Sequence, residues 1–368
     1  MTDASRAKRD PRIDFLRGVA LLTIFIDHMP GNFLGTLTLR NFGFSDAAEL
    51  FVLLSGFSAM IAYGRVFDQA GPGKGLRRVV ARCLRIYAFQ CGLLLTTLAI
   101  FQFWISYFGL EPHKIQMMLH GMQGFGHGLI LHALPSNLNI LPLYVILLAI
   151  FPLLWIGIRR APVTTMLASA GLWMATNVYP DLNLTNWIDG GGWYFNPFAW
   201  QFLFAIGMLL ARLYAAHDRS IASVAPLRLA CAAYLGFALL AAAPWTNWGI
   251  DWRLLDLDPD KTTLAPLRLL NALAFFYVLM TDPWFDRLVR HPWLRLVEIC
   301  GRHSLEVFST GTLFSLIGRL VFRTAGMGLE IQLLVNGAGF ASMIGLALLL
   351  DRPRRADAPR PVLLPGWR

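Results

Sequence analysis

Long apolar segments recur along the whole chain, and they constrain its fold more than any other feature. Of the 368 residues, 56% are hydrophobic and only 15% are charged, whereas about a quarter of a typical soluble protein is charged. An apolar run of about 20 residues can cross a bilayer as a helix. The pattern therefore predicts an all-α polytopic membrane protein, a bundle of about ten transmembrane helices. The predicted spans are 14–34, 44–63, 84–107, 138–158, 162–179, 196–215, 224–243, 265–281, 303–322 and 331–351.

The distribution of positive charge predicts how these spans are oriented. The net charge is +10, and Lys and Arg fall in alternate loops. The positive-inside rule explains this better than binding to nucleic acid, and it predicts that both termini are cytoplasmic. Arg319 and Arg323 break the pattern, because they fall on the outer side. We expect a single transmembrane domain, residues 1–351, followed by a short basic cytoplasmic tail, 352–368.

The cysteines and histidines do not predict a metal site. The four cysteines form no CxxC pair and are expected to be buried free thiols. His113, His120, His127 and His132 are spaced about seven residues apart, but the glycines between them argue against one continuous helix. We expect neither a metal nor a tightly bound cofactor.

Two loops predicted on the outer side, 179–201 and 244–261, are rich in Trp, Asn and Asp. A third outer loop, 106–139, contains four histidines. One interpretation is an aromatic belt at the membrane interface. The other is a carbohydrate site, in which aromatic faces stack on sugar rings and amides bind hydroxyls. The candidate substrate-binding residues in these loops are Asn137, Trp193, Asn196 and Trp200.

The first span, which contains "RIDFLRGVALLTIFIDHMPG" (12–31), retains several ionisable groups. In a helix, Arg17 and His28 share a face and lie roughly 16 Å apart along the axis. Asp14 lies close to that face, and Asp27 points elsewhere. Ionisable residues within a membrane indicate function by default. The alternative is a structural network, with an Asp14–Arg17 ion pair and a hydrogen-bonded His28.

Two further groups extend this constellation. Glu49, near the outer start of the second span, is expected to reach Asp27 or His28. Either Glu49 or Asp27 would then orient the imidazole of His28 and raise its basicity. Three arginines at the cytoplasmic end of the third span would line one side of a helix: Arg78, Arg82 and Arg85. They either anchor the helix by the positive-inside rule or bind a phosphorylated ligand.

These residues carry a resemblance to a known family. Asp14, Leu16-Arg17-Gly18 and His28, with "FVLLSGF" and "RCLRIY", resemble the acyltransferase-3 family of membrane O-acyltransferases. The segments "DHMPGNF", "SDAAELFVLLSGFSA", "ILPLY" and "WYFNPFAWQFLFAIGM" are more similar to its OpgC branch.

The resemblance implies an acyltransferase of the bacterial inner membrane that succinylates osmoregulated periplasmic glucans. The donor would be cytoplasmic acyl-CoA, and the expected acyl-CoA is succinyl-CoA. His28 matches the essential histidine of the family, the general base, and Arg17 matches the basic end of its motif. The R-x-x-x-R element is less clean here, because Arg78/Arg82 and Arg82/Arg85 compete for it.

Several alternatives stay open from the sequence. Direct transfer is favoured over an acyl-enzyme on Ser55 or Ser58, and Asp14 and Asn139 are further candidate ligand contacts. A secondary transporter or flippase would also show intramembrane polar residues. The acyl group and the oligomeric state are not determined. The carboxylate of a succinyl group would need a cation, for which the candidates are Arg40, Arg253, Lys261, Arg319 and Arg323.

Overall fold

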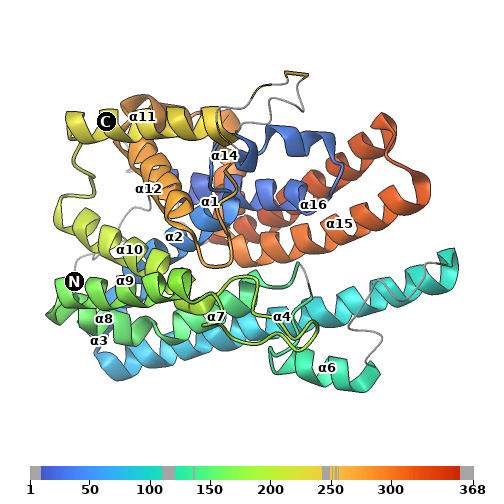
Figure 1. The fold of residues 1–368 in the computed structure, drawn as a ribbon, viewed down its shortest axis with the longest axis horizontal. Coiled ribbons are helices and arrows are strands. Elements are labelled where there is room, and N and C mark those ends of the chain that lie inside the picture. The colour runs from blue at the N-terminus through green and yellow to red at the C-terminus, as the bar shows by residue number, and fades with distance from the viewer. Residues whose placement is uncertain are drawn as a thin grey trace, which may run out of the picture.

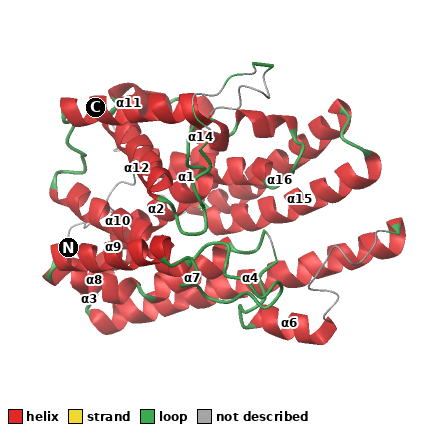
Figure 2. Ribbon diagram, in the orientation of Figure 1, coloured by secondary structure: helices red, strands yellow, loops and turns green. Residues whose placement is uncertain are grey.

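The structure is a computed structural model. It describes residues 10–109, 121–135, 137–242, 249, 250, 252, 255 and 257–356, with side chains up to residue 351. Within these ranges the regular structure is helical, apart from one isolated β-bridge between Thr185 and Gly192 (Figure 2).

Six of the described α-helices begin at a proline, which suits the first turn because its missing N–H would have no helical acceptor there. The α-helices are α1 (Pro11–Asp27), α2 (Ala47–Ala59), α3 (Arg65–Ala70), α4 (Pro72–Phe108), α6 (Gly121–Leu129), α7 (Ile140–Ala149), α8 (Phe151–Arg160), α9 (Pro162–Val178), α10 (Pro197–Ala216), α11 (Ala225–Ala242), α12 (Pro266–Thr281), α13 (Pro283–Val289), α14 (Arg295–Arg302), α15 (Ser304–Ala325) and α16 (Leu329–Ala356).

Length and composition make this a multi-pass membrane protein. In the described chain, six helices are long and apolar enough to cross a bilayer, and α7 with α8 makes a seventh if the bent pair is one span. The six are Ala47–Ala70, Pro72–Phe108, Pro197–Ala216, Ala225–Ala242, Ser304–Ala325 and Leu329–Asp351. The count of ten spans stays a prediction, since α1, α9 and α12 are shorter, at 17, 17 and 16 residues.

Three predicted boundaries were wrong. The first helix ends at Asp27 rather than at 34, because Pro30 lacks an N–H donor and Gly31 takes a left-handed φ of +81°. The expected loop 64–83 is helical, broken only around Gly71. The span expected at 138–158 bends by 48° between α7 and α8, where Pro152 follows the break.

Helix α1 lies at the centre of the bundle, packed against α2, α14 and α15 (Figure 1). Close approach of these helices depends on glycine. A Cβ at Gly301 in α14 would overlap the backbone of Asp14 in α1, and a Cβ at Gly56 in α2 would overlap the carbonyl of Phe204 in α10. Small residues such as Gly56 therefore allow the close packing of these helices.

The first part of α1 and the last part of α16 lie close together at one side of the bundle. Arg302 lies 3.9 Å from the carboxylate of Asp14 near the start of α1, and 3.8 Å from that of Asp351 late in α16. The first and last long helices therefore present these ends on the same side of the molecule. That this side is cytoplasmic stays a prediction. The four cysteines are free, but only Cys300 is buried, and the other three are half-buried rather than buried as predicted.

Candidate active site

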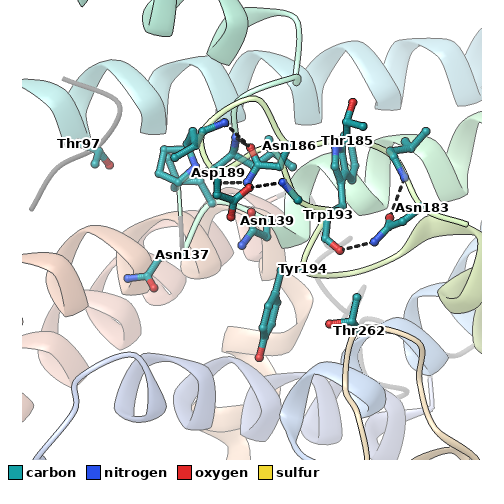
Figure 3. A pocket seen from close by; sticks show the side chains of 18 of the residues that line it. Thr97, Asn137, Asn139, Asn183, Thr185, Asn186, Asp189, Trp193, Tyr194 and Thr262 are labelled. Carbon is teal, nitrogen blue, oxygen red and sulfur yellow. Dashed lines mark hydrogen bonds between the residues drawn. The ribbon is translucent and has the colours of Figure 1, made fainter. Parts of the chain in front are cut away.

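Two cavities of the described chain are relevant to the site, and residues of α1 line only the smaller one. The larger has a volume of about 740 Å³ and is lined by late α4, residues 134, 135 and 137–139, the loop 180–194, Thr262 and late α15 (Figure 3). The smaller, about 340 Å³, is lined by α1 around Arg17, by the α2–α3 junction and by late α10.

The loop over the larger cavity is held by its own amide side chains. Asn186 accepts from the N–H of Leu134 at 3.1 Å and donates to its carbonyl at 3.3 Å. Asn183 donates to the carbonyl of Trp193 at 2.9 Å. Gly190 allows the tip of the loop to turn, with φ of +70°. These asparagines therefore shape the wall of the cavity rather than offering their amides to a ligand.

Other polar and aromatic groups face the cavity itself. Asn137 and Asn139 line it, together with Tyr194, Trp193 and Thr262 (Figure 3). Among the described residues the side chain of Asn139 has no hydrogen-bond partner, so its amide is available to a ligand. Three of the residues predicted from the sequence to bind substrate therefore line this cavity: Asn137, Trp193 and Arg319.

Two other residues predicted to contact substrate, Asn196 and Trp200, do not line either cavity in the structure, and their role in binding stays a prediction. Asn196 is fully buried as the N-cap of α10, accepting from Phe198 at 3.0 Å and donating to the carbonyl of Leu182 at 2.7 Å. Trp200 is also fully buried, and its indole N–H donates to the carbonyls of Lys261 and Thr262 at 3.2 and 3.1 Å. Both side chains hold loops in place, and neither lines a cavity.

His28 is the residue that closes α1. Its backbone N–H donates to the carbonyl of Ile24 at 3.1 Å, so it continues the last helical turn and keeps its spacing from Arg17. The Nδ1 atom of its ring is buried and has no partner among the described residues. Arg319 and Lys261 are among the charged groups that have an electrostatic effect on this imidazole. Arg319 lines the larger cavity, and Lys261 lies beside Tyr194, which also lines it.

The carboxylates expected to orient His28 bind other groups instead. Asp27 accepts from the hydroxyl of Thr38 at 2.6 Å and lies 3.3 Å from Arg40. Glu49 accepts from Nε of Arg268 at 2.7 Å and from the backbone N–H of Asp46 at 2.9 Å. Neither forms the predicted hydrogen bond to the imidazole.

Glu49 belongs to a buried ionic network that sequence reasoning missed. Asp46 binds Lys261 and also Arg268, the latter at 3.2 Å. Burial alone would lower the pKa of Lys261, but the carboxylates of Asp46 and Glu49 outweigh it and hold the pKa above its usual value. The ammonium of Lys261 lies 5.9 Å from the ring centre of Tyr194, which lines the cavity. The capping box from Asp46 to Glu49 was the sequence signal for part of this network.

The smaller cavity gathers positive charge around Arg17. Its other arginines come from four different segments: Arg65, Arg212, Arg219 and Arg302. Arg17 donates to the hydroxyl of Ser304 at 2.5 Å. Asp14 also lines this cavity, and its carboxylate lies 3.9 Å from Arg302. Asp14 does not line the larger cavity.

The arginines of α4 do not join this group. Arg78 and Arg85 are exposed, Arg82 is half-buried, and none of the three lines either cavity. Arg85 pairs with Glu306 at 2.5 Å. The arginines that line the smaller cavity come from other helices and loops. A role for these three in binding a phosphorylated ligand therefore has no geometric support in the described chain.

The remaining candidates are histidines and one arginine. Nδ1 of His127 lies 3.1 Å from Nδ1 of His132, and His127 stacks on Trp187. His113, His120 and Arg253 lie outside the described residues. Within the described ranges, no group of three or more His, Cys, Asp or Glu is arranged to hold a metal ion.

Comparison with known proteins identifies the family. The family model described as OpgC protein matches residues 9–355, nearly the whole chain. No curated protein and no solved structure matches. Membership indicates a transferase that modifies glucans, in keeping with a membrane-spanning bundle that has a polar cavity. The chain therefore belongs to the OpgC protein family.

Proposed function

We propose that this protein is an O-acyltransferase of the bacterial inner membrane, with ten spans and cytoplasmic termini, which transfers a succinyl group from succinyl-CoA to hydroxyls of periplasmic glucans. The observation that carries the proposal is the position of α1. Arg17 lines the smaller cavity, and His28, which itself lines neither cavity, ends the helix within the electrostatic influence of Arg319, which lines the larger one. Eleven residues of helix separate them by about 16 Å.

The smaller cavity suits the donor. Coenzyme A carries phosphates, and guanidinium groups bind phosphate through charge-assisted, often bidentate, hydrogen bonds. Five arginines line this cavity, Arg17 among them. The pantetheine arm is extended and flexible, so it would carry the thioester along the bundle toward His28.

The larger cavity suits the acceptor. Its volume of about 740 Å³ falls within the usual range for small-molecule sites, about 300–1,000 Å³. The ring of Tyr194 supplies an aromatic face, and Asn139 supplies an amide without another partner among the described residues. An aromatic wall with a few polar anchors is the chemistry that binds sugars.

In the proposed reaction His28 acts as the general base. A ring nitrogen removes the proton from a glucan hydroxyl, and the oxygen attacks the thioester carbonyl. The amides of Asn137 and Asn139 are candidate donors to the oxyanion. The C–S bond then breaks, and the thiolate of coenzyme A takes the proton back from the imidazolium.

The positions of the two candidate serines favour direct transfer. Ser58 lines the smaller cavity, at the Arg17 end of α1. Ser55 is only 1% exposed and lines neither cavity. A covalent acyl-enzyme on either serine would hold the acyl group away from the acceptor cavity.

The test is mass spectrometry of periplasmic glucans from cells that lack the gene and are complemented with wild type, His28→Ala or His217→Ala at equal membrane abundance. His217 is exposed and lines neither cavity, so it is the matched control. We expect succinyl groups with wild type and the control and none with His28→Ala. Equal decoration with all three would refute the role of His28. Unmodified glucans in the wild-type strain would refute the acyltransferase and leave a transporter or flippase as the alternative.

A further inference from the structure

One face of α15 brings two arginines into the larger cavity. Thr312, Leu316, Arg319, Leu320 and Arg323 all line it, with the spacing of residues on a single helix face. Arg319 and Arg323 are four residues apart, so their side chains are neighbours. Both fall in the half of the helix that the charge pattern assigns to the outer side, where basic residues are otherwise scarce.

Three other cations among the described residues of this region form ion pairs with carboxylates. Arg40 lies 3.3 Å from Asp27, Lys261 binds Asp46, and Arg268 lies 2.7 Å from Glu49. These pairs compensate the cost of burying charge within the protein itself.

Within the arginine pair the two like charges act on each other. Arg323 repels Arg319 electrostatically, and Arg323 itself has no hydrogen bond or ion pair with any described residue. Both carboxylates that line the cavity, Asp181 and Asp189, are exposed residues of the loop. Two adjacent guanidinium groups facing a cavity repel each other, and an oxyanion between them relieves that repulsion through charge-assisted hydrogen bonds.

The arginine pair also lies beside His28. Gly318 of α15 packs against the side chain of Met29, the residue after His28. Among the charged groups, Arg319 has the largest electrostatic effect on the imidazole of His28. A group bound by the arginines is therefore held close to the proposed base, which limits how long the bound molecule can be.

We propose that Arg319 and Arg323 form an oxyanion subsite that selects the group transferred at this site. The proposal rests on the proposed acyltransferase function. The bound anion is the free carboxylate of a short dicarboxylic acyl group, or an acidic substituent already present on the acceptor. A four-carbon acyl group separates its carboxylate from its thioester carbon by three C–C bonds, about 4 Å, which suits the short path from the arginines to His28.

The experiment compares donors with purified full-length protein in lipid nanodiscs. Succinyl-CoA is compared with butyryl-CoA, which has the same number of carbons and no charge. The acceptors are a neutral glucan and the same glucan carrying phosphate esters, and products are counted by mass spectrometry. The variants are Arg319→Gln, Arg323→Gln and the charge-conserving Arg319→Lys. Arg290→Gln is the control, because Arg290 pairs with Asp286 on the surface and lines neither cavity.

We expect the preference for succinyl over butyryl to fall about 10- to 100-fold in the glutamine variants, the equivalent of losing a hydrogen bond to a charged group. In the glutamine variants butyryl transfer should fall much less than succinyl transfer, the control should be unchanged, and Arg319→Lys should keep part of the preference. If the glutamine variants lose transfer activity only with the phosphorylated glucan, the subsite is supported and the bound anion belongs to the acceptor. Unchanged preference with both acceptors overturns the proposal while leaving the acyltransferase intact. No transfer from either donor by the wild-type protein refutes the proposed function instead.

Discussion

Replacing Glu49 with glutamine should test the buried network at the start of α2. The carboxylate is fully buried, and its two oxygens serve two donors: Nε of Arg268 at 2.7 Å and the N–H of Asp46 at 2.9 Å. A glutamine side chain has the same shape but presents one acceptor and one donor. One of the two N–H groups would then face another N–H.

The contacts set the size of the expected loss. A buried donor left without an acceptor costs about 1–3 kcal/mol. Breaking a buried ion pair by removing one partner costs about 3–5 kcal/mol. Arg268 keeps a second carboxylate, Asp46, at 3.2 Å, so the lower end applies. We expect the free energy of unfolding of Glu49→Gln to fall by about 3 kcal/mol.

Thermal unfolding in detergent, followed by intrinsic tryptophan fluorescence at a fixed scan rate, measures this loss. Tm shifts by about 2–4 °C per kcal/mol in chains of 150–250 residues, and we expect a slightly smaller shift, about 1.5 °C per kcal/mol, in this longer chain. Tm should therefore fall by about 5 °C. Glu330→Gln is the control, since Glu330 is exposed and should leave Tm unchanged. A Tm for Glu49→Gln within 1 °C of wild type would refute the reasoning. It would mean that Glu49 already carries a proton in the folded protein and does not need both acceptor oxygens.

Two further predictions concern α1. Gly301→Ala would push a methyl group into the backbone of Asp14 and should cost about 1–3 kcal/mol, read as a lower Tm. Gly92→Ala in α4 has nothing within 4 Å of its new Cβ and should not lower Tm. Burial alone would raise the pKa of Asp10, but hydrogen bonds from Arg12 and Tyr214 hold it below its ordinary value of 3.8. The Tm advantage of wild type over Asp10→Asn should therefore persist above pH 3.8 and vanish as the pH falls through the lower folded pKa. An advantage that disappeared above pH 5 would contradict this assignment.

The sequence by itself determined the class of the protein and the helix that carries its candidate base. Apolar runs of about 20 residues can satisfy their backbone groups in lipid only as helices, so the pattern of hydropathy was enough to predict an α-helical membrane bundle. The spacing of Arg17 and His28 follows from helical geometry, and both residues lie on α1 as predicted. Residues far apart on one helix need no tertiary information to be placed relative to each other.

The tertiary structure decided which polar groups meet. Sequence position placed Glu49 beside His28, whereas packing of α12 brings Arg268 to it. Asn196 and Trp200 belong to an aromatic, amide-rich segment, yet they are buried hydrogen-bond donors that hold loops. The basic residues around Arg17 come from four segments spread over more than two hundred residues, and the arginines of α4 are not among them. Hydropathy fixes the helices but not the rotation and neighbours of each one, because these depend on close contacts such as those at Gly56 and Gly301.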